Sequence, residues 1–166
     1  MAVTLVLVRH GRAQSMAEAP SDEARELTPA GRSALERAYP ATFSLLDLPA
    51  DGDVEMWASP ALRAVQTSEV VAANVPVRET SQHAVLFFQD EDAFLEELAV
   101  RVADRDSGVV VCVGHVPFME DVALRLCGAT LPFRPGAAAA IELDSVDPAG
   151  GRAPGVLRWF VQGPDA

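Results

Sequence analysis

Two histidines of this chain directly follow apolar runs that are rich in β-branched residues. The run Val3–Val8 leads into Arg9–Gly11, which reads RHG, and the run Val109–Val113 leads into Gly114–His115. Such runs without polar alternation are typical of central strands covered on both faces, as in a parallel α/β sheet. Ligands of these sheets bind at the carboxyl ends of the strands, so the two motifs form a candidate site. The other interpretation of the first motif is a strand that simply stops at surface polar residues.

A third motif brings an arginine toward the same edge of the sheet. Val54–Ala58 predicts a second strand, and Ser59 and Pro60 then predict the N-cap and the first residue of a helix. Arg63 falls in the first turn of this helix, where a long side chain leans back toward the helix N-terminus. We therefore expect Arg63 to point beyond the end of the preceding strand. For a single arginine, however, an ordinary solvated position is the favoured interpretation.

Two arginines and two histidines at one sheet edge suit a phosphoryl group. Guanidinium groups pair bidentately with phosphoryl oxygens and stay charged at any working pH. A neutral histidine can attack phosphorus, and His10 suits this role because the turn at Gly11 can offer a carbonyl that holds one ring nitrogen protonated. A protonated His115 would serve as a further positive donor. Metal binding is the rival chemistry, but three histidines would need carboxylates as further ligands, and the neighbouring arginines would repel a cation.

Proline and capping residues predict the other helices. Thr28 and the proline after it indicate an N-cap and a helix start, with Pro40 either ending or kinking that helix. Asp92 could cap a helix whose apolar residues follow the helical period. Pro117 opens a further helix, which Gly128 closes as a C-terminal cap.

Short apolar segments predict the remaining strands. We expect Pro76–Glu79 to form a short edge strand, and Ala137–Leu143 and Val156–Val161 to form an antiparallel hairpin around a turn at Asp147–Gly155. The predicted fold is a single domain, residues 1–166, of the α/β class. It has three layers, with a mostly parallel central sheet, helices on both faces and the antiparallel hairpin at its C-terminal end.

Composition limits the partners and the cellular location. The 166 residues are 49% hydrophobic and 22% charged, as in ordinary folded domains, but the net charge is −11. Nucleic acids and anionic membranes are bound mainly through Lys and Arg, so this charge argues against both partners. Because no apolar run has the length of a membrane span and the start lacks the basic segment of a signal peptide, we expect a cytoplasmic protein.

Cys112 and Cys127 are then expected to be buried free thiols rather than a disulfide, a zinc pair or a nucleophile.

Four motifs in a fixed order carry a family resemblance. They are VRHG at Val8–Gly11, LTPAGR at Leu27–Arg32, SPALRAVQT at Ser59–Thr67 and VGHVP at Val113–Pro117. Together they resemble the histidine phosphatase superfamily, whose fold is phosphoglycerate mutase-like. The short length and the absence of inserted segments are similar to its small bacterial phosphohistidine phosphatases, the SixA type. With the four motifs taken together, a solvated position for Arg63 is no longer the favoured interpretation.

The resemblance implies a phosphatase that works in two steps and needs no metal or other cofactor. His10 would be the phosphorylated nucleophile, and water would then attack the phosphohistidine. The remaining groups would bind phosphoryl oxygens: the side chains of Arg9, Arg63 and His115, and the backbone N–H groups near Gly11 and Val116.

Two departures from the family pattern bear on the substrate. Many members have an acidic residue directly after RHG, whereas this chain has Arg12, which either adds positive charge at the pocket rim or is simply solvated. Larger members also supply a carboxylic general acid from a loop that here reads LFFQDED, where Asp90 and Glu91 are candidates. The leaving nitrogen of a phosphoramidate is readily protonated, so its cleavage depends less on an enzymic acid. A missing acid therefore favours phosphohistidine over phosphate esters.

We therefore expect a phosphatase that acts on phosphohistidine in a protein. Two alternatives stay open. One is a phosphomonoesterase or mutase-like enzyme that uses the same site on a small phosphorylated metabolite, and the other is a noncatalytic domain that binds phospho-ligands. Specificity would depend on the loops Ala13–Glu26 and Phe87–Asp92, where the sequence carries little readable information.

Overall fold

Six strands form one mixed sheet in the computed structural model, which describes residues 2–105, 107–149 and 155–165. The strands are Val3–Arg9 (β1), Val54–Ala58 (β2), Glu79–Gln82 (β3), Val109–Gly114 (β4), Ala138–Leu143 (β5) and Gly155–Val161 (β6). Their order across the sheet is β3-β2-β4-β1-β5-β6. The first four strands of this order are parallel, β5 is antiparallel to β1, and β6 is antiparallel to β5. This confirms the mostly parallel sheet and the C-terminal hairpin, whose expected turn lies partly outside the described residues.

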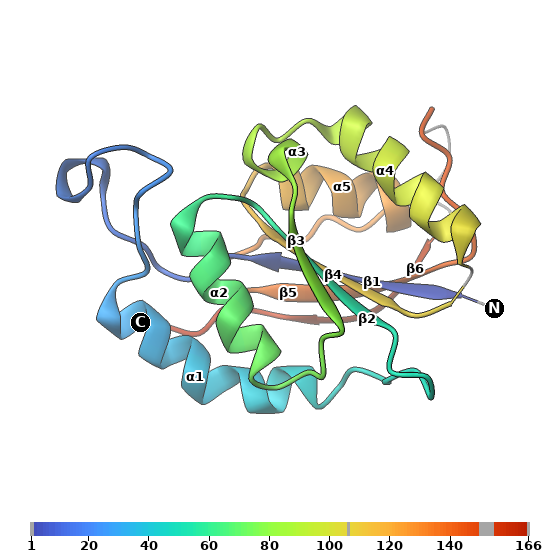
Figure 1. Ribbon diagram of the computed structural model, residues 1–166, viewed down its shortest axis with the longest axis horizontal. Helices are drawn as coiled ribbons and strands as arrows, with labels where there is room; N and C mark the ends of the chain where they lie inside the picture. Colours follow the sequence, from blue (N-terminus) through green and yellow to red (C-terminus); the bar gives the residue numbers. More distant parts are fainter. Residues whose placement is uncertain (1, 106, 150–154, 166) are drawn as a thin grey trace.

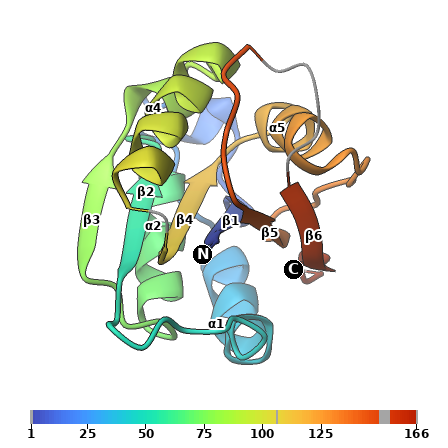
Figure 2. The ribbon, with the colours of Figure 1, turned by 90° about the vertical axis from the view of Figure 1, so that its right-hand side faces the viewer.

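Helices cover both faces of the sheet. They are Pro29–Phe43 (α1), Leu62–Ala72 (α2), Ala84–Phe87 (α3), Glu91–Asp104 (α4) and Phe118–Cys127 (α5), with a 3-10 helix at Met16–Glu18 (η1). The helices α1 and α2 lie on one face, and α4 and α5 lie on the other (Figure 1, Figure 2). The predicted three-layer arrangement is therefore confirmed.

The strand β1 contributes to a separate hydrophobic core on each face. Val6 and Val8 pack in the core that includes Leu35 of α1, whereas Leu5 and Leu7 pack in the core formed with α4 and α5. A strand covered on both faces needs an apolar side chain at nearly every position. This requirement explains the continuous apolar runs of β1 and β4.

The capping residues of two helices act as predicted. Oγ1 of Thr28 accepts a hydrogen bond from the Gly31 N–H at 2.9 Å, and α1 begins directly after it. The helix continues through Pro40 instead of ending there. Gly128 follows α5 with φ 73°, a left-handed conformation that glycine adopts without a steric cost.

The starts of α4 and β3 differ from the prediction. Asp90, and not Asp92, caps α4, because its carboxylate accepts from the N–H of Ala93 at 3.1 Å. The edge strand β3 begins three residues later than expected, because the chain makes a tight turn at Pro76 before it pairs with β2. The residues of β3 are polar, so the apolar pattern did not reveal them.

The two cysteines do not form a disulfide with each other. Cys112 and Cys127 are free thiols, the first buried in β4 and the second only partly buried at the end of α5. None of the helices in the described chain is long and apolar enough to cross a bilayer.

Candidate active site

The ends of β1 and β4 bring the two histidines together. The strands pair in parallel with Arg9 opposite Gly114, so His10 and His115 leave the sheet side by side, with ring centroids 5.2 Å apart. Arg63, the second residue of α2, reaches both rings. Its Nε lies 3.3 Å from Nε2 of His10, and its Nη2 lies 3.5 Å from Nδ1 of His115. Arg63 is therefore buried between the histidines and is not a solvated helix residue.

His10 is held as a neutral ring. Its Nδ1 lies 2.6 Å from the carbonyl oxygen of Gly11, which is the contact expected from the sequence. This contact assigns the proton to Nδ1 and leaves a lone pair on Nε2. Burial is the main cause that lowers the pKa of His10 to about 3, and the neighbouring positive groups act in the same direction, while the Gly11 contact opposes them. A neutral imidazole with one unprotonated nitrogen is the form that attacks phosphorus.

His115 is oriented by a serine that we had predicted to cap a helix. Its Nε2 lies 2.8 Å from Oγ of Ser59, which is fully buried. The same Oγ accepts from the N–H of Ala61 at 3.2 Å. The predicted helix start at Ser59 and Pro60 is wrong, because α2 begins at Leu62 with Ala61 as its N-cap residue.

The surroundings of His115 also determine its protonation state. Burial, followed by the charge of Arg63, lowers the pKa of His115 to about 4, although Asp22 opposes this shift. The ring is therefore neutral at physiological pH in this structure, not protonated. A bound phosphoryl dianion would raise the pKa again, because an opposite charge favours the protonated form.

Titration of the two rings by NMR tests these pKa shifts. A histidine with an ordinary pKa near 6.5 is only about 3% neutral at pH 5. We expect the His10 and His115 ring resonances to keep their neutral positions from pH 8 down to pH 5, because their pKa values are about 3 and about 4. Added inorganic phosphate should shift the titration of His115 to higher pH. Assignment uses the variants His10→Ala and His115→Ala, and a His10 midpoint between pH 6 and 7 would contradict the buried neutral ring.

Arg9 lies at the end of β1 and faces the same cavity. Its Nη1 donates to the carbonyl oxygen of Phe133 at 2.8 Å, which fixes the guanidinium. Its Nε is buried and has no hydrogen-bond partner within the described parts of the chain. Burial lowers the pKa of Arg9 and Glu120 opposes this, but a guanidinium stays charged at any working pH. Arg9 therefore adds a permanent positive charge beside His10.

The fold and part of the sequence match known proteins. Residues 5–84 match the model of the histidine phosphatase superfamily, branch 1. A proposed phosphohistidine phosphatase SixA from Nakamurella multipartitia has 27% sequence identity and a TM-score of 0.78, with 100% of this chain and 98% of that chain covered. The chain is therefore similar to the histidine phosphatase superfamily, in sequence over residues 5–84 and in fold over its whole length.

More distant structures share the histidine phosphatase fold. The protein histidine phosphatase SixA complexed with tungstate has 23% identity and a TM-score of 0.72, with 96% of each chain covered. A mycobacterial glucosyl-3-phosphoglycerate phosphatase has 15% identity and a TM-score of 0.64, with 99% of this chain and 100% of that chain covered. No curated protein matches the chain in sequence.

The candidate active site also includes a carboxylate that the sequence did not predict. Asp22 lies in the loop before α1, and its carbonyl oxygen accepts from Nη1 of Arg63 at 2.6 Å. Its Oδ2 accepts from Nη2 of Arg63 at 3.3 Å, and its Oδ1 accepts from Nη1 of Arg25 at 2.9 Å. The hydrogen bond from Arg25 is the main cause that lowers the pKa of Asp22, so this carboxyl is ionised at neutral pH. A polar loop without apolar periodicity gives no signal of which side chain turns inward.

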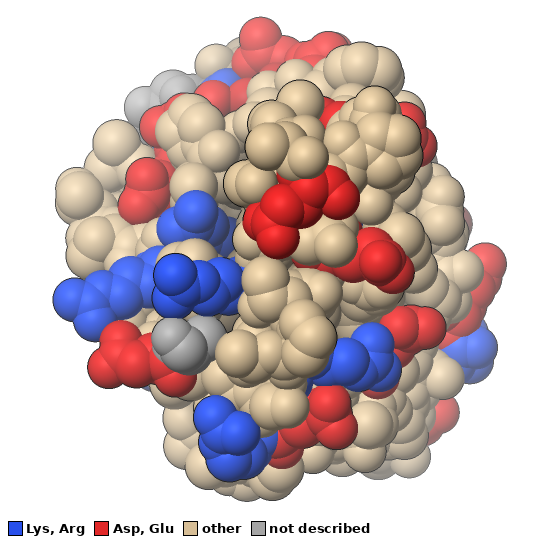
Figure 3. Space-filling view, turned by 90° about the vertical axis from the view of Figure 1, so that its left-hand side faces the viewer, with Lys and Arg blue, Asp and Glu red and all other residues tan. Residues whose placement is uncertain are grey.

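These residues surround a cavity of about 230 Å³ at the carboxyl ends of β1 and β4. Figure 3 shows this end of the molecule, where basic side chains gather on the left half of the view although the net charge of the chain is −11. The cavity is lined by Arg9, His10, Asp22, Arg25, Arg63, Phe87, Gln89, His115 and Val116.

Gly11 has a different role from the one implied by the family resemblance. Its N–H donates to Oγ1 of Thr67 at 3.1 Å, inside the protein, so this N–H is not available to a phosphoryl oxygen. The expectation of a phosphate-binding N–H at Gly11 is therefore wrong. A Cβ at this position would come within 2.7 Å of Leu35 Cδ1, which explains the glycine by close packing. Val116 does line the cavity and stays a candidate backbone donor.

The two candidate general acids are held away from the cavity. The carboxylate of Asp90 caps α4, and Glu91 forms an ion pair with Arg125 at 3.1 Å. Neither belongs to the cavity lining as far as the chain is described. The structure therefore does not place either candidate acid where it could reach the leaving group. Gln89 lines the cavity instead, with Oε1 accepting from the N–H of Phe118 at 3.0 Å, and an amide cannot act as a proton-donating acid.

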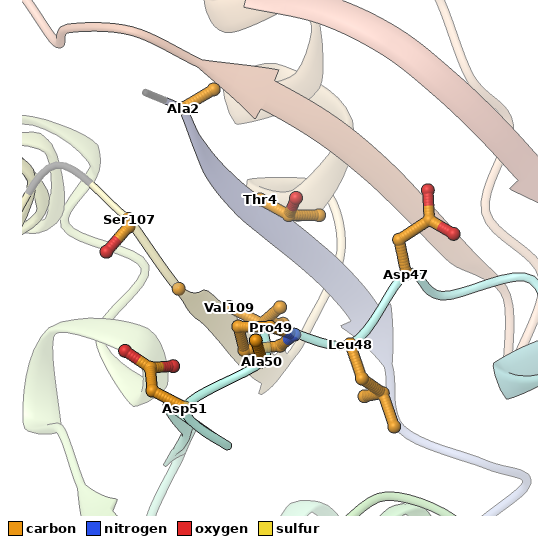
Figure 4. Close-up of a pocket in the computed structure, with 10 residues that line it drawn as sticks. Ala2, Thr4, Asp47, Leu48, Pro49, Ala50, Asp51, Ser107 and Val109 are labelled. Carbon is orange, nitrogen blue, oxygen red and sulfur yellow. The ribbon is translucent and has the colours of Figure 1, made fainter.

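Arg12 and a hollow with a larger volume than this cavity both lie outside it. Arg12 is exposed and lines a separate small hollow with Arg134 and Asp165. The larger hollow, of about 500 Å³, lies beside the amino-terminal half of β1, around Thr4 and Leu48 (Figure 4). None of its described lining residues is an arginine or a histidine. The candidate active site is therefore identified by its chemistry and not by its size.

Proposed function

We propose that this chain hydrolyses phosphohistidine in a protein through a phosphoryl group carried on Nε2 of His10. The observation that carries the proposal is the orientation of the neutral His10 ring, whose Nδ1 contacts the Gly11 carbonyl while Nε2 faces Arg63. In the first step Nε2 attacks phosphorus, the P–N bond of the substrate breaks, and the released histidine takes up a proton. In the second step water attacks phospho-His10 and releases inorganic phosphate.

Positive groups support the charge of the transferred phosphoryl group. The Arg63 guanidinium lies 3.3 Å from the attacking nitrogen, and Arg9 lines the same cavity. His115 also lines it and gains a positive charge only when a bound phosphoryl dianion raises its pKa. Charges that are already in place stabilise a transition state without the cost of reorganisation. An entering phosphoryl group competes with the Asp22 carboxylate for Nη2 of Arg63 and with the Asp22 backbone carbonyl for Nη1, because it accepts hydrogen bonds from the same N–H groups.

The absence of a suitable acid favours a nitrogen leaving group. Within the described lining, Asp22 is the only carboxylate, and its lowered pKa keeps it ionised. An alkoxide leaving group needs a proton donor in the transition state, whereas the imidazole nitrogen of phosphohistidine is readily protonated from solvent. A solved relative named as a protein histidine phosphatase supports this class, although another relative is named as a sugar-phosphate phosphatase.

The form of the cavity supports a protein substrate. A volume of about 230 Å³ suits a phosphoryl group with one attached ring and leaves little room for a larger metabolite. Phe88, next to the lining residue Phe87, is 74% exposed and offers an apolar contact for a partner protein. The net charge of −11 argues against a nucleic acid as partner.

Turnover of matched substrates tests the substrate class. We expect kcat/KM for a phosphohistidine-containing protein to exceed that for phosphoserine, glucose phosphate and phosphoglycerate by at least about 100-fold. This factor is the smaller end of the rate gain from general acid catalysis, which the esters need and this site does not supply. Free phosphohistidine serves as the control that separates leaving-group chemistry from protein recognition. Equal or faster turnover of an ester would contradict the proposal and favour the small-molecule phosphomonoesterase.

A further inference from the structure

A hydrogen-bonded chain of three side chains lies on the open edge of the sheet, away from the phosphatase cavity. Oγ of Ser81 lies 2.7 Å from Nε2 of His83, and Nδ1 of His83 lies 2.8 Å from Oε2 of Glu97. The carboxylate accepts a hydrogen bond from the Nδ1–H group, which leaves the unprotonated Nε2 as the acceptor for the serine hydroxyl. This is the order of nucleophile, base and orienting carboxylate used in serine hydrolysis.

The base of this chain is fixed by packing. The His83 ring stacks on Trp57, with centroids 4.4 Å apart and an interplanar angle of 20°. Ser81 belongs to β3, and Glu97 belongs to α4, which Figure 2 shows above the edge of the sheet. Groups on rigid elements keep the distances that proton transfer requires.

A mostly apolar groove of about 450 Å³ adjoins this histidine. Val100 is 70% exposed in it, while the guanidinium of Arg101 is bound by Glu55 and Asp53 and so is not free to attract an anion. The groove therefore suits an uncharged apolar group. Its lining residues are Trp57, His83, Glu97, Val100, Arg101 and Asp104, and none of them lines the phosphatase cavity.

The edge position of β3 also supplies a donor for a developing oxyanion. The N–H of His83 donates to the carbonyl of Ala58 in β2 at 2.9 Å. Because N–H directions alternate along an extended chain, the N–H of Gln82 faces away from β2, toward the open edge. This N–H follows the serine directly in sequence, as an oxyanion donor can.

We propose that Ser81, His83 and Glu97 form a second active centre that hydrolyses uncharged esters with a short apolar acyl group. Oγ of Ser81 attacks the ester carbonyl while His83 Nε2 takes the hydroxyl proton, and Glu97 stabilises the imidazolium. The C–O bond to the alcohol then breaks, and His83 returns the proton to the leaving oxygen. Water, activated by the same nitrogen, cleaves the acyl-serine and releases the carboxylic acid.

Labelling with an alkyl fluorophosphonate tests this centre directly. The reagent phosphonylates an activated serine with loss of fluoride, and peptide mass spectrometry locates the adduct. We expect one adduct, on Ser81, and none in Ser81→Ala. His83→Ala should slow labelling by at least about 100-fold, the range of general base catalysis. Glu97→Gln keeps a hydrogen-bond acceptor without the charge and should slow labelling by roughly tenfold or more.

Hydrolysis of p-nitrophenyl butyrate provides the second measurement. It is measured in the His10→Ala background, so that the phosphatase nucleophile cannot accept the acyl group, and Ser81→Ala in that background should lose the enzymic rate. Thermal unfolding of every variant, and phosphatase turnover in the wild-type His10 background, separate a chemical loss from a folding defect. No adduct on Ser81, or a labelling rate unchanged by both His83→Ala and Glu97→Gln, would overturn the proposal and leave the proposed phosphatase function untouched.

Discussion

Replacing His10 with alanine should reduce turnover of a phosphohistidine protein by at least about 10³-fold, because the attacking nitrogen is lost. Binding of tungstate should be retained, since Arg9 and Arg63 still line the cavity and the substitution removes a neutral ring. The measurement is kcat/KM together with a calorimetric tungstate titration, on protein whose thermal unfolding matches the wild type. Hydrolysis that survives this change would show that another group attacks phosphorus.

A trapped phosphoenzyme separates catalysis from mere binding. Wild-type protein that is quenched in alkali during turnover should carry one acid-labile phosphoryl group on His10, and the His10→Ala variant should carry none. Wild-type protein that binds tungstate but never forms this adduct would instead support the noncatalytic phospho-ligand domain. The trap is thus the sharpest distinction between the two classes of function that fit the same cavity.

The parts of the site that follow strands could be predicted from the sequence. The apolar runs of β1 and β4 are signals of strands buried on both faces, and the residues directly after them must leave the sheet at its carboxyl edge. Parallel pairing, with Arg9 opposite Gly114, then places His10 beside His115. The direction in which helical side chains lean made Arg63 a candidate, but a solvated position stayed the favoured interpretation until the four family motifs were taken together. The placement of the two histidines thus depends on local rules that tertiary contacts did not override.

The parts that depend on contacts between distant segments could not be predicted. Asp22 reaches Arg63 only because the polar loop before α1 folds over the start of α2. Ser59 has the residue type of an N-cap, but its hydroxyl is used by His115, which is 56 positions away along the chain. In the acidic segment after β3, two aspartates suit a helix cap, and only the packing of α4 decides that Asp90 takes this place. In each case one residue type fits two local roles, and the fold selects between them.

Replacing Arg63 with alanine is expected to have the next largest effect. Its guanidinium contacts the attacking nitrogen of His10 and is buried, so no solvent cation can take its place. We expect kcat/KM to fall by about 10³-fold, the lower range for an arginine that stabilises a phosphoryl transition state, and tungstate binding to weaken strongly. Arg37→Ala, an exposed arginine of α1, provides the matched control and should leave both values unchanged.

The loss at Arg63 has two physical sources that further variants separate. Arg63→Lys keeps the positive charge but not the planar fork, so it should recover only part of the activity. Asp22→Asn removes the charge that competes for the guanidinium, and it should strengthen tungstate binding, because less of the Arg63 charge is then neutralised within the protein. If Asp22→Asn lowers turnover as much as Arg63→Ala does, Arg63 acts mainly by fastening the loop before α1. If tungstate affinity is unchanged in Arg63→Ala, the guanidinium does not bind the phosphoryl group at all. The opposite signs expected for Asp22→Asn and Arg63→Ala in the same binding assay are therefore the decisive comparison.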